Sequence, residues 1–167
     1  VGHWWRTAES KWHNETLDTA APAVPPTAIA LPGGGAMLLV RRAESSDVVA
    51  YYRGAKDEVW DVTAHELKGK GGIGTIAALA PESWDGRVAL AGRDDDGGVS
   101  MSIVDVDSRT VETNWGDGGP RIVHSPSLAM DGGILTVAAI GSDGNLQLAR
   151  QDRPGFGLPK NWAPVET

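Results

Sequence analysis

The sequence predicts an all-β protein made of repeated units of four short antiparallel strands. Three observations lead to this prediction. The 167 residues include 22 glycines, which indicates many tight turns between short strands. Four of the seven tryptophans recur at intervals of roughly fifty residues, a spacing typical of repeat proteins. No window of helical length carries apolar residues at the spacing i, i+3, i+4 that an amphipathic helix requires.

Each complete unit begins with a short apolar segment, and a turn that contains glycine follows it. These first segments are 27–31, 75–79 and 127–130. The second apolar segments, which are expected to pair with the first, are 37–41, 88–92 and 134–138. Because glycine accepts the positive φ angles of tight turns, each pair of segments predicts a β-hairpin.

A third segment follows a polar turn in each unit, and a tryptophan marks the fourth segment. The third segments are 48–52, 99–103 and 146–150. Apolar and polar residues alternate in 99–103 and in 146–150, and one face of each third strand is expected to point into the core. The four recurring tryptophans are Trp12, Trp60, Trp115 and Trp162. Recurrence once per unit predicts a structural role, in which each ring packs one unit against another.

The repeat divides the chain into a half unit and three whole units. Their expected ranges are 1–22, 23–68, 69–121 and 122–167. Four-stranded units of about 40–50 residues are typical of the blades of a β-propeller, so we predict three and a half blades here. A β-sandwich is the structural alternative, but it does not explain the recurring tryptophans. Because closed propellers have roughly 4–8 blades, we expect either self-association or an upstream segment to complete the ring.

Charge and composition exclude several classes of function. The net charge of -7 and the pI near 5.0 disfavour nucleic-acid binding, which normally needs a basic face. No apolar run approaches the roughly 18 residues of a membrane span. Cysteine is absent, so no disulfide or thiolate metal site is expected. This absence does not predict whether the protein is secreted or intracellular. We expect no cofactor and no bound metal, since the acidic turn 94–96 lacks the spacing of a calcium-binding loop.

The third whole unit resembles the repeats of a known family. The run Ser125-Pro126-Ser127-Leu128-Ala129 is followed by a strand, by Gly141-Ser142-Asp143-Gly144-Asn145-Leu146, and then by Asn161-Trp162. This order resembles the repeats of bacterial and fungal propeller lectins, the Photorhabdus-type and fucose-binding families. The first two whole units match it in outline only, because the first lacks the Asp-Gly turn and the second carries an insertion around Trp84.

The resemblance implies that a carbohydrate binds in pockets between neighbouring blades. In such a pocket an aromatic ring stacks on the sugar, while Arg, Glu or Gln side chains bond to its hydroxyls. A rigid aromatic ring suits the apolar C–H face of a pyranose, and a charged fork suits its polar edge. We expect an extracellular protein on the same ground.

Four residues are candidates for ligand contact, namely Trp84, Tyr52, Arg53 and Trp5. Trp84 occupies a turn where the other units carry glycine, so we expect it to be exposed for contact with a ligand or partner. Arg53 with a neighbouring tyrosine can line a sugar pocket, although these aromatic residues can equally pack an outer strand. Trp4 and Trp5 point to opposite faces of one strand, so only one of them belongs in the core.

Other functions compatible with the sequence are a non-catalytic scaffold for protein–protein contact and an accessory domain of a secreted hydrolase. A sialidase-type glycosidase fits less well. The segment Ser142-Asp143-Gly144 lacks the spacing of the repeats found in sialidases and the Thr-Trp that follows them. We therefore expect the chain not to be an enzyme.

Overall fold

The computed structural model describes residues 1–6, 9–18, 20–57, 59–68, 72, 74–117, 119–155 and 157–165. Within these residues the fold is all-β, as predicted, with fourteen strands and one short 3₁₀ turn, η1 (Glu82–Trp84). The strands form a two-stranded sheet and three four-stranded sheets, all antiparallel. The predicted unit boundary at residue 69 and the last predicted residue, 167, lie outside the described residues.

Each sheet is a simple meander in which consecutive strands pair. The first sheet contains β1 (Gly2–Arg6) and β2 (Trp12–Thr16). The second sheet contains β3 (Thr27–Ala30), β4 (Ala36–Arg41), β5 (Val48–Arg53) and β6 (Asp61–Glu66). The third sheet contains β7 (Ala77–Leu79), β8 (Arg87–Arg93), β9 (Val99–Asp105) and β10 (Thr110–Asp117). The fourth sheet contains β11 (Ser127–Asp131), β12 (Ile134–Ile140), β13 (Leu146–Arg150) and β14 (Trp162–Pro164).

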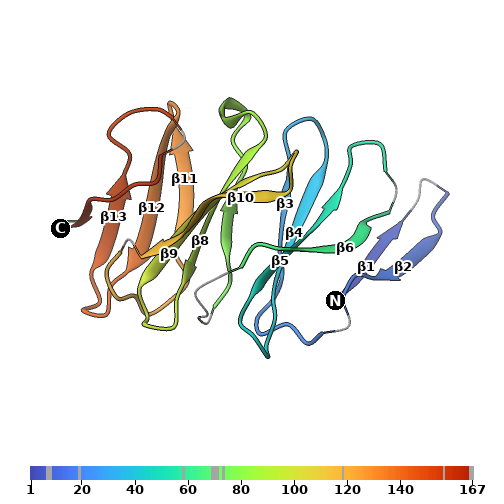
Figure 1. Cartoon of the computed structure of the whole chain (residues 1–167), viewed down its shortest axis with the longest axis horizontal. Helices are drawn as coiled ribbons and strands as arrows, with labels where there is room; N and C mark the ends of the chain where they lie inside the picture. The colour runs from blue at the N-terminus through green and yellow to red at the C-terminus, as the bar shows by residue number, and fades with distance from the viewer. Residues whose placement is uncertain are drawn as a thin grey trace.

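The four sheets follow one another across the molecule in chain order, from the N-terminal hairpin to the C-terminal sheet (Figure 1). The first strands of the three four-stranded sheets lie closest together, because β7 contacts both β3 and β11. Thr27 donates a hydrogen bond from Oγ1 to the main-chain oxygen of Ile76 at 2.7 Å. In the next interface, Thr75 and Ser125 join their hydroxyls at 3.0 Å. The sheets therefore converge along their first strands.

The core consists of the layers of side chains between neighbouring sheets. Side chains of a strand alternate between the two faces of its sheet, and residues 37–41 of β4 and 88–92 of β8 are all buried, so both faces of these strands are covered. In β12, by contrast, only Leu135, Val137 and Ala139 are buried, while the residues between them are half-buried. The fourth sheet is thus covered on one face by the described residues.

Three of the four recurring tryptophans face the preceding sheet, and they are not equally buried. Trp60 and Trp115 are each 8% exposed and belong to the cores that join the first three sheets. Trp162 is half-buried and packs against the core between the third and fourth sheets. There a Cβ at Gly119 would lie 2.9 Å from Cε2 of Trp162, so only glycine allows this close approach. The prediction that Trp12 packs in the same way is wrong for the described residues, because 66% of its surface is exposed.

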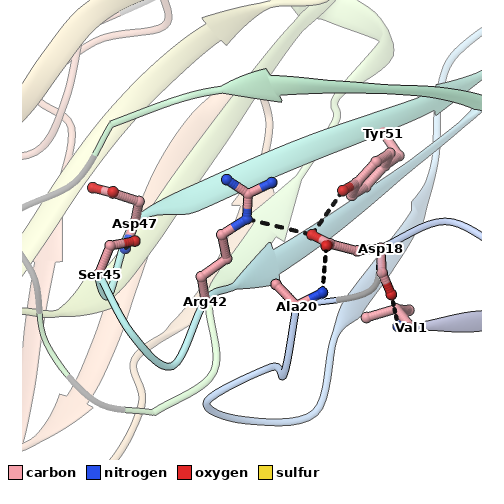
Figure 2. Close-up of polar contacts among 7 residues, drawn as sticks. All are labelled: Val1, Asp18, Ala20, Arg42, Ser45, Asp47 and Tyr51. Carbon is pink, nitrogen blue, oxygen red and sulfur yellow. Dashed lines mark hydrogen bonds and ion pairs between the residues drawn. The ribbon is translucent and has the colours of Figure 1, made fainter.

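A buried carboxylate fastens the segment after β2 to the second sheet (Figure 2). Asp18 accepts hydrogen bonds from the Tyr51 hydroxyl at 2.7 Å and from the main-chain N–H of Ala20 at 2.8 Å. Arg42 lies against the same carboxylate, with Nε 3.4 Å from Oδ2. Desolvation raises the pKa of Asp18, but the two hydrogen bonds and the Arg42 charge outweigh it and lower the pKa overall. The carboxylate therefore stays ionised although it is buried.

None of the described residues forms a helix that is long and apolar enough to cross a membrane.

Candidate functional site

A cavity of about 320 Å³ lies between the second and third sheets. Two connecting turns and two strand ends form its wall: the β3–β4 turn, the β9–β10 turn, the end of β5 and the start of β8. Polar and aromatic side chains on this wall come from Tyr52, Arg53, Asp107 and Arg109. Two of the four residues predicted to contact a ligand, Tyr52 and Arg53, are thus found together at one cavity between two sheets.

Tyr52 stands on the face of β5 that points to the third sheet. It is 4% exposed and packs in the core with Leu90 and Trp115 of that sheet. The edge of its ring meets His65 of β6, with ring centres 5.5 Å apart. Its hydroxyl is buried and has no hydrogen-bond partner among the described residues. Burial raises the pKa of Tyr52 to about 12, so the hydroxyl keeps its proton and remains a hydrogen-bond donor.

Arg109 reaches across from the β9–β10 turn and covers Tyr52. Its guanidinium carbon lies 5.1 Å from the centre of the Tyr52 ring, a cation–π arrangement. Its Nη1 donates to Oδ2 of Asp61 at 2.6 Å and lies 3.1 Å from Nε2 of His65. Arg109 has a φ of +56°, a left-handed conformation that is uncommon outside glycine and that sets the direction of the side chain at this turn. The second and third sheets are therefore clamped together beside the cavity.

Asp61 holds Arg109 in place as an ionised group. The main-chain N–H of Thr63 and the Arg109 guanidinium both bond to its carboxylate and lower its pKa to about 2. The Arg109 contact also requires that Nε2 of His65 accept a hydrogen bond, so in this arrangement the nitrogen carries no proton. Arg109 is therefore held in place through its Nη1 atom, and its side chain borders the cavity.

Arg53 borders the cavity, but its charge points elsewhere. Its guanidinium carbon lies 5.8 Å from the centre of the Trp60 ring, on the face of the second sheet opposite to Tyr52. The cation that lies over Tyr52 is Arg109, which is not among the residues predicted to contact a ligand. The polar run 105–110 offered a signal, since it places acidic, hydroxyl and basic side chains in one turn. The sequence does not show which sheet that turn faces.

The structure corrects the expectation for Trp84. The side chain is 1% exposed and packs with Ala89, Ile103 and Leu135 between the third and fourth sheets. The turn η1 and the left-handed Asp85 that follows it, with a φ of +47°, bring the ring into the core instead of out to solvent. Trp84 is a core residue in a position where the other units have a short turn.

Trp5 lies on the face of β1 that points to the second sheet, away from the cavity at Tyr52. Its ring is half-buried and stacks between two imidazoles, with centres 4.9 Å from His3 and 5.3 Å from His13. His3 in turn bonds to Glu15 and meets the edge of the Trp60 ring. Trp5 thus holds in the first sheet the place that Tyr52 holds in the second.

Two further hollows are less suited to an oriented ligand. One, of about 710 Å³, is bordered by a single loop, at residues 150–155 and 157–161. The other, of about 230 Å³, lies between the first and second sheets and is bordered by His3, Trp4 and Trp60. Among the described residues no group of three or more Asp, Glu, His or Cys side chains could hold a metal ion. The cavity at Tyr52 combines an aromatic ring of the second sheet with the charged side chains of Asp107 and Arg109 from the third.

None of the protein-family models compared with this chain matches it, and a comparison with curated proteins finds no significant similarity.

Proposed function

We propose that this chain is part of a β-propeller and that it binds a carbohydrate, without catalysis, in the cavity between the second and third sheets. The propeller is supported by three successive four-stranded meanders whose first strands converge. Sheets that splay outward from such a line of contact are the blades of a propeller when the ring closes. The location at a junction between blades agrees with the resemblance of the third whole unit to propeller lectins.

The observation that carries the proposed binding is the pairing of Tyr52 with Arg109. A tyrosine ring, a buried hydroxyl with no partner among the described residues and a guanidinium lie together at one cavity. A buried donor without a partner costs about 1–3 kcal/mol, and a ligand oxygen that reaches it recovers that cost. Sugars supply both kinds of group that this cavity can satisfy: apolar C–H surface for its lining of Leu31, Val88 and Val106, and hydroxyls for Tyr52, Arg109 and Asp107.

The size of the cavity narrows the class of ligand. Its volume of about 320 Å³ lies at the lower end of the range of roughly 300–1,000 Å³ typical of small-molecule sites. We therefore propose a monosaccharide or the terminal residue of a glycan, inserted between the β3–β4 turn and the β9–β10 turn.

The acid–base properties of the site favour binding over hydrolysis. A glycosidase needs one carboxylic acid whose pKa is raised, so that it can protonate the leaving oxygen. The pKa of Asp61 is instead lowered to about 2, and its carboxylate is already engaged by Arg109. We propose on this ground that the site binds a sugar without hydrolysing it. From the resemblance to propeller lectins we propose that the protein is extracellular.

Glycan-array screening of the whole chain, followed by calorimetric titration of the sugars that bind, tests the proposal. Arg109→Gln should weaken binding by about tenfold or more, which corresponds to about 1.4 kcal/mol. Tyr52→Phe should weaken it less, because the ring remains and only the hydroxyl is lost. Arg121→Gln is the matched control, since it removes an equal charge from an exposed residue that does not border the cavity.

Two outcomes would contradict the proposal. In one, the chain binds no glycan at high density on the array. In the other, a glycan binds but its affinity is the same for Arg109→Gln and Arg121→Gln, which would place the sugar elsewhere on the molecule.

A scaffold role in protein–protein contact is the second candidate function. It is favoured by the exposed tryptophans Trp4 and Trp12, which are 65% and 66% exposed on the first sheet.

A further inference from the structure

The first sheet carries an aromatic face that points away from the rest of the molecule. Directly paired residues of two antiparallel strands point to the same side of a sheet. Trp4 pairs with Asn14, and Arg6 pairs with Trp12. The alternate pair, His3 and Glu15, contacts Trp60 of the second sheet. Trp4, Arg6 and Trp12 therefore form the opposite face, which we call the Trp4–Trp12 face.

The second sheet carries the same pattern of residues, and there it is covered. The run Trp4-Trp5-Arg6 corresponds to Tyr51-Tyr52-Arg53, and Trp12 corresponds to Trp60. Tyr51 and Trp60 are only 1% and 8% exposed, because the first sheet and the segment after it pack against them. Trp4 and Trp12 are 65% and 66% exposed. In the second sheet, the face that carries Tyr51 and Trp60 forms an interface with the first sheet. The corresponding face of the first sheet, which carries Trp4 and Trp12, is uncovered.

Neighbouring four-stranded sheets of the chain, and the first pair of sheets, contact each other through the same pair of faces each time. The repeat tryptophans Trp60, Trp115 and Trp162 each pack toward the sheet that precedes their own. The surface that receives them is always the opposite face of that preceding sheet. By this rule, the partner of the Trp4–Trp12 face is a sheet of the same kind. It contributes its far face, which is the face that points away from the preceding sheet of its own chain.

The fourth sheet offers such a far face. Leu135, Val137 and Ala139 of β12 are turned to the third sheet, so the residues between them point the other way. These are Ile134, Thr136, Ala138 and Ile140, all half-buried. On β13, Leu148 pairs with Ala138 and Leu146 pairs with Ile140, so both leucines join this face, and Leu146 is 41% exposed. We call it the Ile134–Leu148 face.

We propose that the Trp4–Trp12 face of one chain binds the Ile134–Leu148 face of a second copy of this chain. The two exposed indoles offer on the order of 300 Å² of apolar surface, which is the size of the largest apolar patch on a typical monomer, a patch that is often functional. The contact joins two different faces, so two copies either close on each other through two identical interfaces or continue into a longer assembly. The interface uses neither Tyr52 nor Arg109, so it can be tested separately from sugar binding.

Sedimentation velocity of the whole chain over a range of concentrations tests the proposal. The expected result is a species of at least twice the 17.5 kDa of one chain. Trp12→Glu and Leu148→Glu should each weaken the association at least tenfold, because each buries a charge in one side of the contact. Val62→Glu is the control, since Val62 is 61% exposed on β6 and belongs to neither face. Circular dichroism checks that all three variants fold.

Mixing the two interface variants adds a test of the direction of the contact. Each mixed pair retains one intact interface, so Trp12→Glu and Leu148→Glu chains should associate with each other more strongly than either does with itself. Native mass spectrometry distinguishes the chains by mass.

Three results would overturn the proposal. The first is a wild-type chain that stays a monomer at the highest concentration, which would leave these faces to a different partner. The second is association that Trp12→Glu abolishes and Leu148→Glu leaves unchanged, which would mean that the Trp4–Trp12 face pairs with itself. The third is association that resists both substitutions.

Discussion

Trp115 donates a hydrogen bond from its indole nitrogen to the main-chain oxygen of Leu67 at 3.0 Å, and this bond joins the third sheet to the second. Leu67 follows β6 and is fully buried, so its carbonyl oxygen is shielded from solvent. The indole fills the space between the two sheets and also satisfies a polar group there. A phenylalanine ring can do only the first of these, which gives a physical reason for tryptophan at this position.

Trp115→Phe should therefore lower the free energy of unfolding by about 1–3 kcal/mol, the cost of leaving a buried carbonyl without its partner. Urea denaturation measures the change. The exposed Val62 of the adjacent β6 provides the control, because Val62→Ala should stay within about 0.5 kcal/mol of the wild type. Equal small losses for both variants would show that the Leu67 bond contributes nothing to stability.

Trp84→Ala should be among the most destabilising single substitutions in this chain. Its side chain is 1% exposed in the core between the third and fourth sheets, and truncation of a buried tryptophan costs about 3–5 kcal/mol. Trp84→Phe should lose less, since most of the volume is kept. If instead Trp84→Phe left stability unchanged and abolished sugar binding, Trp84 would have to contact the ligand.

The neighbouring tyrosines Tyr51 and Tyr52 should respond oppositely to loss of the hydroxyl. Tyr51→Phe removes a hydrogen bond of 2.7 Å to the Asp18 carboxylate and should cost about 1.5–3 kcal/mol, as for bonds to charged groups. Tyr52→Phe removes a buried hydroxyl that has no partner among the described residues. It should leave the free energy of unfolding unchanged or raise it by up to about 1 kcal/mol. Urea denaturation of the two variants without sugar measures the contrast, and a loss for Tyr52→Phe equal to that for Tyr51→Phe would contradict it.

The buried Asp18 should make the fold sensitive to acid. The pKa of Asp18 in the folded chain lies below the ordinary value of 3.8, so folding favours the ionised form. Its contribution to stability is then fully present above pH 3.8 and is lost as the pH falls through the lowered pKa. Urea denaturation at several values from about pH 6 to about pH 2 measures this loss.

Asp18→Asn should be less stable than the wild type at neutral pH and should lose less stability on acidification. The control is Glu44→Gln, which removes the same charge from an exposed residue. An acid response that is the same in all three proteins would mean that other carboxylates are responsible.

The strands could be predicted because their signals are local. Polar turns followed by short runs rich in apolar residues predicted the third strands at 48–52, 99–103 and 146–150, and the structure places β5, β9 and β13 at 48–53, 99–105 and 146–150. Such signals require only the backbone preferences of a few neighbouring residues. The burial of Trp84 and the exposure of Trp12 are not local properties, since each depends on whether another sheet lies against the ring.

The candidate site was predictable in part for the same reason. Tyr52 and Arg53 attracted attention as an aromatic residue and a cation at the end of a strand. Arg109 comes from the neighbouring sheet, and its place over the Tyr52 ring follows from how two sheets pack. The sequence also contains no sign that Arg53 turns to Trp60, because that choice depends on which face of β5 the first sheet covers.

The order of residues along the chain is enough to predict an all-β fold, strands in groups of four and a tryptophan that recurs from group to group. Period-two alternation and positive-φ turns are enough for this, because they act over a few residues. The packing of the sheets sets three further features: which tryptophans are buried, which cation covers Tyr52, and which two sheet faces stay open. Those outcomes depend on packing between segments about fifty residues apart, where a side chain gains or loses its environment only after the sheets have come together.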